Sequence, residues 1–230
     1  MERRLKMITP DMLASDPFSP GTVDFERDMS AAPLFALALM AANALVFGWE
    51  LAVGALQSRA AIIAAGAVYA EKVFDGQSWR LLTGTFLHAS FGHLLGNCLA
   101  LYILGLASER AWGRLKSLGI YFVSGLGASL LSATMSTRPS VGASGAIFGL
   151  LGAAIIFFYR HRASLNARDR RIGAVLLGWA AFQLVMGSMN PMIDNWAHLG
   201  GLAAGLAMGL ALAPELRRPA RRQVSVEPLG

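Results

Sequence analysis

Residues 196–213 read WAHLGGLAAGLAMGLALA, an apolar stretch with glycine at positions 201, 205 and 209 and one histidine, His198. About 17–25 apolar residues in a helix cross the roughly 30 Å hydrocarbon core of a bilayer. Small residues four apart lie on one helix face and allow two membrane helices to approach closely. The stretch therefore predicts a membrane helix, packed against a neighbour through its glycines.

The rest of the chain extends this pattern. Of its 230 residues 55% are hydrophobic and 15% charged, and the mean hydropathy is +0.50, whereas soluble domains carry about a quarter charged residues. The predicted spans are 34–54, 91–107, 117–136, 144–159, 172–188 and 196–213. We predict an all-α membrane protein, a bundle of six transmembrane helices over 31–213, with tails at 1–30 and 214–230.

The net charge of +6 and the pI near 10.1 raise the alternative of a nucleic-acid-binding protein. However, the positions of the basic residues follow the predicted spans. Sixteen of the 20 Lys and Arg fall in the two tails and in every second connection, leaving Arg59, Lys72, Arg80 and Arg138 on the other side. Positively charged loops stay in the cytoplasm. This distribution predicts that both termini are cytoplasmic and favours a membrane protein that does not bind nucleic acid.

The N-terminal tail, the long connection 55–90 and the single cysteine also bear on how the chain is organised. The tail 1–30 is rich in acidic residues and proline, which predicts a mobile cytoplasmic segment. The long connection 55–90 is apolar but interrupted, and we place it at the outer interface, with Trp79 at headgroup depth and the Arg80 guanidinium in water. Cys98 is the only cysteine, which excludes an intramolecular disulfide and a cysteine-rich metal site.

Polar side chains inside membrane spans are costly, so each is a candidate functional residue. We identify His93 and Asn97 in the second span, Ser144 at the start of the fourth and His198 near the start of the sixth. With a cytoplasmic N-terminus, all three helix starts lie on the outer side, so the four residues share one depth. His93 and Asn97 are four apart and project from the same helix face.

Ser144 lies in the sequence GASG at 142–145, where flanking glycines allow a tight turn and leave the hydroxyl approachable. A serine nucleophile needs a base within about 2.6–3.2 Å and donors for the oxyanion. His198 is the remaining intramembrane base. A Ser–His dyad is the more economical arrangement, while Asp194, just before the span, stays open as a third member.

Glycines predict how these two helices meet. Gly145 and Gly149 lie on one face of the fourth span, opposite the glycines of the sixth. Close backbone approach there would bring Ser144 and His198 within hydrogen-bonding reach. Each polar residue alone has an ordinary explanation: Ser144 bonding its own backbone, Asn97 joining helices, His93 packed in the core. Their convergence on three helices at one depth favours a catalytic site.

These motifs together resemble the rhomboid family of intramembrane serine proteases over residues 34–213. The matching segments are Trp79-Arg80, His93-x-x-x-Asn97, Gly142-Ala143-Ser144-Gly145 and Ala197-His198-x-x-Gly201-x-x-x-Gly205. The resemblance implies cleavage of membrane-anchored, single-span proteins in or beside their transmembrane segment, without metal, ATP or another cofactor. We also predict a multi-pass protein of the bacterial cell (inner) membrane, and the distribution of Lys and Arg predicts that its active site faces the extracytoplasmic side.

By motif position, the resemblance implies that Ser144 is the nucleophile and His198 its base. It implies that His93, Asn97 and the Ser144 backbone N–H form the oxyanion hole. Glu109-Arg110 followed by Gly113 resembles the family's structural turn after the second span. Phe148 departs from the family, which often has tyrosine there; the ring can still stack on His198, but without a hydroxyl.

Two other functions stay open. A catalytically inactive relative that only binds membrane helices typically lacks the serine or the histidine, and both are present here. A small transporter or channel would place polar residues near the bilayer midplane and interrupt its helices there. The substrate-binding residues and the physiological substrate do not follow from the sequence.

Overall fold

The apolar stretches of the sequence form helices in the computed structural model, which describes residues 23–26, 29, 32–166 and 168–214. Over these residues the chain has helices and two isolated β-bridges but no strand. By length and composition, four stretches are long and apolar enough to cross a membrane: Leu34–Ala52, Phe91–Met135, Ser144–Ser164 and Asp169–Met189. The prediction that the chain is all-α is confirmed over the described residues.

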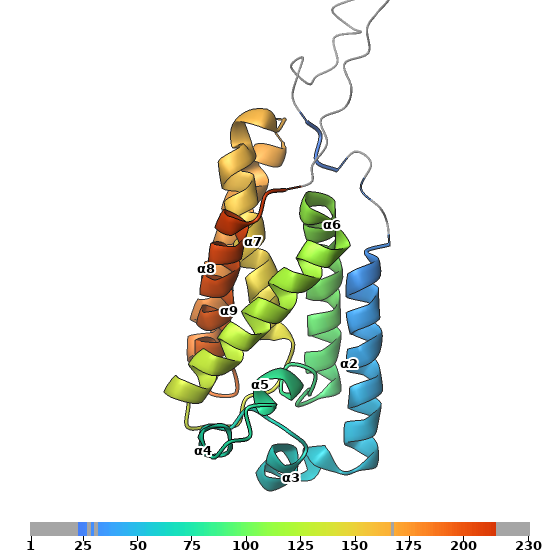
Figure 1. Cartoon of the computed structure of the whole chain (residues 1–230), viewed down its shortest axis with the longest axis vertical. Helices are drawn as coiled ribbons and strands as arrows, with labels where there is room; N and C mark the ends of the chain where they lie inside the picture. Colours follow the sequence, from blue (N-terminus) through green and yellow to red (C-terminus); the bar gives the residue numbers. More distant parts are fainter. Residues whose placement is uncertain (1–22, 27–28, 30–31, 167, 215–230) are drawn as a thin grey trace, which may run out of the picture.

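The longer helices run roughly along one axis, and three short ones gather at one end of the bundle (Figure 1). The long helices are α2 (Leu34–Ala52), α6 (Phe91–Met135), α7 (Ser144–His161), α8 (Ile172–Met189) and α9 (Asn195–Ala211). The short ones are α3 (Arg59–Ala64), α4 (Ala70–Phe74) and α5 (Arg80–Thr83), with 3₁₀ turns η1 (Ala55–Gln57), η2 (Arg162–Ser164) and η3 (Asp169–Arg171).

Helix α6 is two helical segments joined at Gly113, where the family resemblance implies a structural turn. Gly113 has φ 72° and ψ 174°, a left-handed conformation that favours glycine. Figure 1 shows the two segments as separate rods that run in opposite directions. The segments coincide with the predicted spans 91–107 and 117–136. Helix α9, with 17 residues, is not among the four stretches of spanning length, so the count of six spans stays a prediction.

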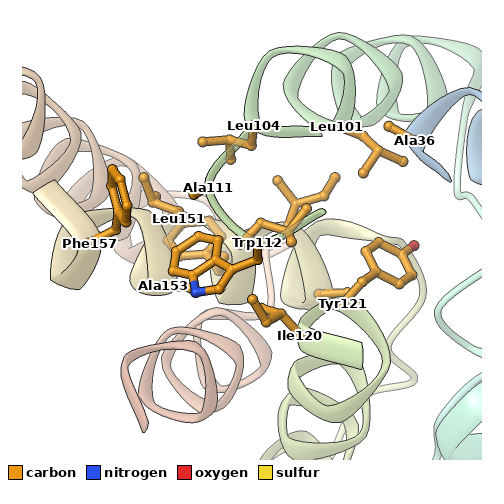
Figure 2. Close-up of a cluster of buried hydrophobic side chains, with 14 of the residues drawn as sticks. Ala36, Leu101, Leu104, Ala111, Trp112, Ile120, Tyr121, Leu151, Ala153 and Phe157 are labelled. Carbon is orange, nitrogen blue, oxygen red and sulfur yellow. The ribbon is translucent and has the colours of Figure 1, made fainter. Parts of the chain in front are cut away.

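Helix α7 lies at the centre of the bundle. Twelve of its residues are buried, and its Phe157 packs edge-on against Trp112 with ring centroids 5.5 Å apart. Figure 2 shows this part of the core, where Trp112, Ile120 and Tyr121 of α6 gather near Leu151 of α7. By contrast, α8 buries only Ala180 and Gly187 and turns most of its apolar side chains outward. The central position of α7 holds Ser144 at a rigid helix start.

The predicted glycine contact joins α7 to α9. A Cβ added to Gly201 would overlap the carbonyl oxygen of Gly145, and one added to Gly205 would overlap that of Gly149. A Cβ on Gly209 would lie 2.9 Å from the Ala153 Cα, which is a milder overlap. The two backbones therefore touch along this face, as small residues in membrane helices allow.

The connection 55–90 forms η1, α3, α4 and α5, and Gly66, at φ 115°, ends its first apolar run. The expectation that the Arg80 guanidinium faces water is wrong, because Arg80 is buried. Its guanidinium donates to the carbonyl oxygens of Ile63 at 2.5 Å and Ala67 at 3.1 Å, while Trp79 stays half exposed. These bonds tie α5 to the backbone at the end of α3, so Arg80 stabilises the fold of this connection.

Part of the N-terminal segment packs on the opposite end of the bundle. Val23 and Phe25 are buried, and Val23 pairs with Leu165 in a parallel bridge. The Phe25 ring lies 4.8 Å from that of Phe158, and its N–H donates to a buried Asp169 carboxylate at 2.6 Å. Most of the predicted tails 1–30 and 214–230 lies outside the described residues, so those domain bounds stay predictions.

Candidate active site

Three helix starts meet at the end of the bundle that holds α3, α4 and α5 (Figure 1). Ser90 caps α6 by accepting the His93 N–H, and Asp194 caps α9 by accepting the N–H groups of Trp196 and Ala197. Such caps fix where a helix begins. They set the depth at which His93 and His198 leave their helices, while Ser144 is the first residue of α7, which has no side-chain cap.

Ser144 and His198 are brought together as the sequence predicts. The His198 Nε2 lies 3.0 Å from the Ser144 Oγ, within the distance that a nucleophile and its base require. Phe148, one turn along α7 from Ser144, stacks on the His198 ring with centroids 4.2 Å apart and planes 9° from parallel. The stack holds the imidazole plane where its Nε2 faces the hydroxyl, and the expected Phe148 contact is confirmed.

Asp194 is engaged elsewhere than at the His198 imidazole. One carboxylate oxygen caps α9, and the other accepts the Ser132 hydroxyl at 2.5 Å. The His198 Nδ1, which a third triad member would bind, has no hydrogen-bond partner in the described part of the chain. The geometry thus favours a dyad, with Asp194 fixing the start of α9.

His93 and Asn97 converge on the turn that precedes Ser144. Gly142 has φ 123°, and a Cβ added there would lie 2.8 Å from the His93 Nε2 and 3.4 Å from the Asn97 Nδ2. The Asn97 Nδ2 is buried and finds no acceptor within the described residues. A buried donor without a partner is costly, so this amide is available to an oxygen that arrives with a ligand.

Two residues beside the site were missed by the sequence analysis, Glu50 and His88. Both are fully buried, and the Glu50 carboxylate accepts the His88 N–H at 3.1 and 3.0 Å. The His88 ring lies 5.2 Å from the His93 ring, edge to face. Glu50 falls inside the predicted span 34–54, where an acidic side chain is itself a signal of function. The sequence alone could therefore have identified Glu50.

The His88 ring is neutral at physiological pH. Burial and, to a smaller degree, the neighbouring His93 lower the pKa of His88 from 6.5 to about 4. The His88 Nδ1 lies 3.0 Å from the Phe86 carbonyl oxygen, which can only accept, so Nδ1 carries the proton.

Over the described residues, no group of three or more His, Cys, Asp or Glu side chains could hold a metal ion.

Comparison with known proteins identifies the family of this chain. The family model described as Rhomboid domain matches residues 75–215, well over half of the chain. The chain belongs to the rhomboid family. It is similar to the rhomboid protease AarA of Providencia stuartii, with 31% identity over 83% of this chain and 77% of the relative. Together with its apolar helices, membership of this family makes the chain an integral membrane protein.

Other rhomboid relatives are longer. The rhomboid protease GluP of Bacillus subtilis is 36% identical over 78% of this chain but only 35% of its own length. The RHOMBOID-like protein 5 of Arabidopsis thaliana is 35% identical over 64% of this chain and 48% of its own. The chain thus spans less than half the length of these two relatives, which come from a bacterium and a plant.

Proposed function

We propose that this rhomboid chain is an intramembrane serine endopeptidase that cleaves membrane-anchored proteins in or near their transmembrane segment with a Ser144–His198 dyad. The observation that carries the proposal is the 3.0 Å contact between the His198 Nε2 and the Ser144 Oγ. The relatives AarA and GluP, both named rhomboid proteases, support the same activity.

In the proposed reaction, the Ser144 Oγ attacks the scissile carbonyl carbon while the His198 Nε2 takes the hydroxyl proton. The tetrahedral intermediate collapses when the carbon–nitrogen bond breaks, and His198 returns the proton to the leaving amine. Water then attacks the acyl-enzyme, again with His198 as base, which releases the carboxylic acid and restores Ser144. The Phe148 stack supports this role by keeping the imidazole plane fixed through both proton transfers.

Three donors would stabilise the oxyanion. The Ser144 N–H belongs to the first turn of α7, where helix N–H groups have no acceptor within the helix. The Asn97 Nδ2 is an unpaired buried donor, and the His93 Nε2 lies beside the same turn at Gly142. Charge that develops on the carbonyl oxygen would find these donors already oriented, at no cost in reorganisation.

The same proposal includes the finer topology. Six spans with both termini in the cytoplasm would put the Ser144 end of the bundle on the extracytoplasmic side, and the distribution of Lys and Arg supports it. The proposed substrates are proteins with a single transmembrane segment, and the proposed location is the bacterial cell (inner) membrane; the relatives AarA and GluP come from bacteria.

The test is cleavage of a single-span membrane protein by the detergent-purified chain, alongside labelling by a fluorophosphonate that reacts with activated serines. The wild type should cleave and label. Ser144→Ala should do neither, and His198→Ala should fall to background because no base remains. Full cleavage by folded Ser144→Ala would overturn the nucleophile and with it the proposed mechanism.

A further inference from the structure

Helix α2 reaches the proposed site through one buried acidic side chain. Glu50 lies in the last turn of α2 and is fully buried. A carboxylate costs free energy in such a place unless it is hydrogen-bonded. Both of its oxygens accept the N–H of His88, at 3.1 and 3.0 Å, so Glu50 fixes the backbone just ahead of α6.

That backbone carries a ring that touches the site. The His88 side chain is fully buried, its Nδ1 donates to the Phe86 carbonyl, and its ring packs edge to face on His93 at 5.2 Å. His93 in turn meets the turn at Gly142, where only a glycine leaves room for its imidazole. The contacts therefore form a continuous series from α2 to the residues that precede Ser144.

We propose that Glu50 and His88 are positioning residues that hold the His93 imidazole in the oxyanion hole. Helix α2 lies outside the matched rhomboid domain, which begins at residue 75, yet it supplies the carboxylate on which this arrangement rests. The inference rests on the proposed function, since it assigns how one oxyanion donor of that site is held. The proposal gives neither residue a contact with the substrate or the reacting atoms.

The test compares kcat and KM of the purified full chain on a single-span substrate, with active sites counted by fluorophosphonate labelling run to completion. In Glu50→Ala, kcat per labelled site should fall about tenfold or more with KM within about twofold, because a misplaced donor weakens transition-state binding alone. Glu50→Gln, whose amide oxygen still accepts the His88 N–H, should recover most of that loss.

Asn43→Ala is the matched control, since Asn43 is another fully buried polar residue of α2, about two turns from Glu50. It should leave kcat per labelled site unchanged even if it lowers stability. If Glu50→Ala does not fold, Glu50→Asp, which keeps the carboxylate but shortens its reach, should show an intermediate loss of kcat.

Two results would overturn the inference. One is a wild-type kcat per labelled site in Glu50→Ala, or in Glu50→Asp where only that variant folds. The other is an equal loss in Asn43→Ala, which would reduce Glu50 to a packing residue. Failure of the wild type to cleave would instead overturn the proposed function, so the two failures are distinct.

Discussion

At the scale of single residues, the oxyanion donors can be separated from the dyad. Asn97→Ala removes one buried amide that has no partner in the described structure. Loss of one oxyanion donor elsewhere costs roughly 10²–10³ in rate, so cleavage should fall by that order yet stay above the Ser144→Ala background. Fluorophosphonate labelling should slow but reach completion. Wild-type rates in this variant would remove Asn97 from the oxyanion hole.

Also at this scale, His88 makes the fold sensitive to acid. Its pKa falls from 6.5 in the unfolded chain to about 4 in the folded one, so between these values the unfolded state binds more protons. The His88 contribution to stability is therefore complete above about pH 6.5 and is lost as the pH falls toward 4. Detergent-unfolding titrations at about pH 7 and 5 should show a smaller acid loss in His88→Phe than in wild type. His161→Phe is the control, and an equal acid loss in both variants would contradict the assignment.

At the scale of elements, the contact between α7 and α9 decides whether the dyad forms. A side chain at Gly201 must push these helices apart, because it meets backbone atoms of Gly145 that cannot rotate away. Gly201→Leu should insert into the membrane but lose cleavage. Gly209→Ala should keep more activity, and Gly178→Ala, whose added Cβ meets nothing within 4 Å, should behave as wild type. Normal cleavage by Gly201→Leu would show that the α7–α9 contact does not determine the position of Ser144 relative to His198.

At the scale of the whole molecule, the segment before α2 packs on one end of the bundle and stabilises it. In the proposed topology this is the cytoplasmic end. Phe25 is 2% exposed and packs between Phe157 and Phe158. Removing a buried phenylalanine costs about 3–5 kcal/mol, so Phe25→Ala should lower the free energy of unfolding by that order, measured by detergent titration. Glu26→Ala breaks only an exposed pair with Arg168 and should cost about 1 kcal/mol or less. Equal free energies of unfolding for the two variants would mean that Phe25 packing does not stabilise this end of the bundle.

The orientation of the whole molecule is open to a direct test. A cysteine introduced at Ser164, in a variant without Cys98, should react with thiol reagents only when they reach the cytoplasm. The reason is that the connection 160–171 holds five arginines, which stay inside. Labelling from outside intact cells would show that the bundle has the opposite orientation, with Ser144 on the cytoplasmic side.

The sequence by itself determined the features that depend on local spacing. Apolar length predicts α2, both segments of α6, α7 and α8, and glycines four apart predict the α7–α9 contact, because helix geometry repeats along the chain. His93, Asn97, Ser144 and His198 were also found this way, since each is a polar residue in an apolar stretch.

Only the tertiary structure decided the pairings between distant segments. Glu50 meets His88 across 38 residues, and Phe25 meets Asp169 across 144. Arg80 turns inward and donates to carbonyls 13 and 17 residues away. A polar group is buried without a large cost only when it has a hydrogen-bond partner. The spacing of residues in the sequence does not show which distant residue the fold brings close enough to be that partner.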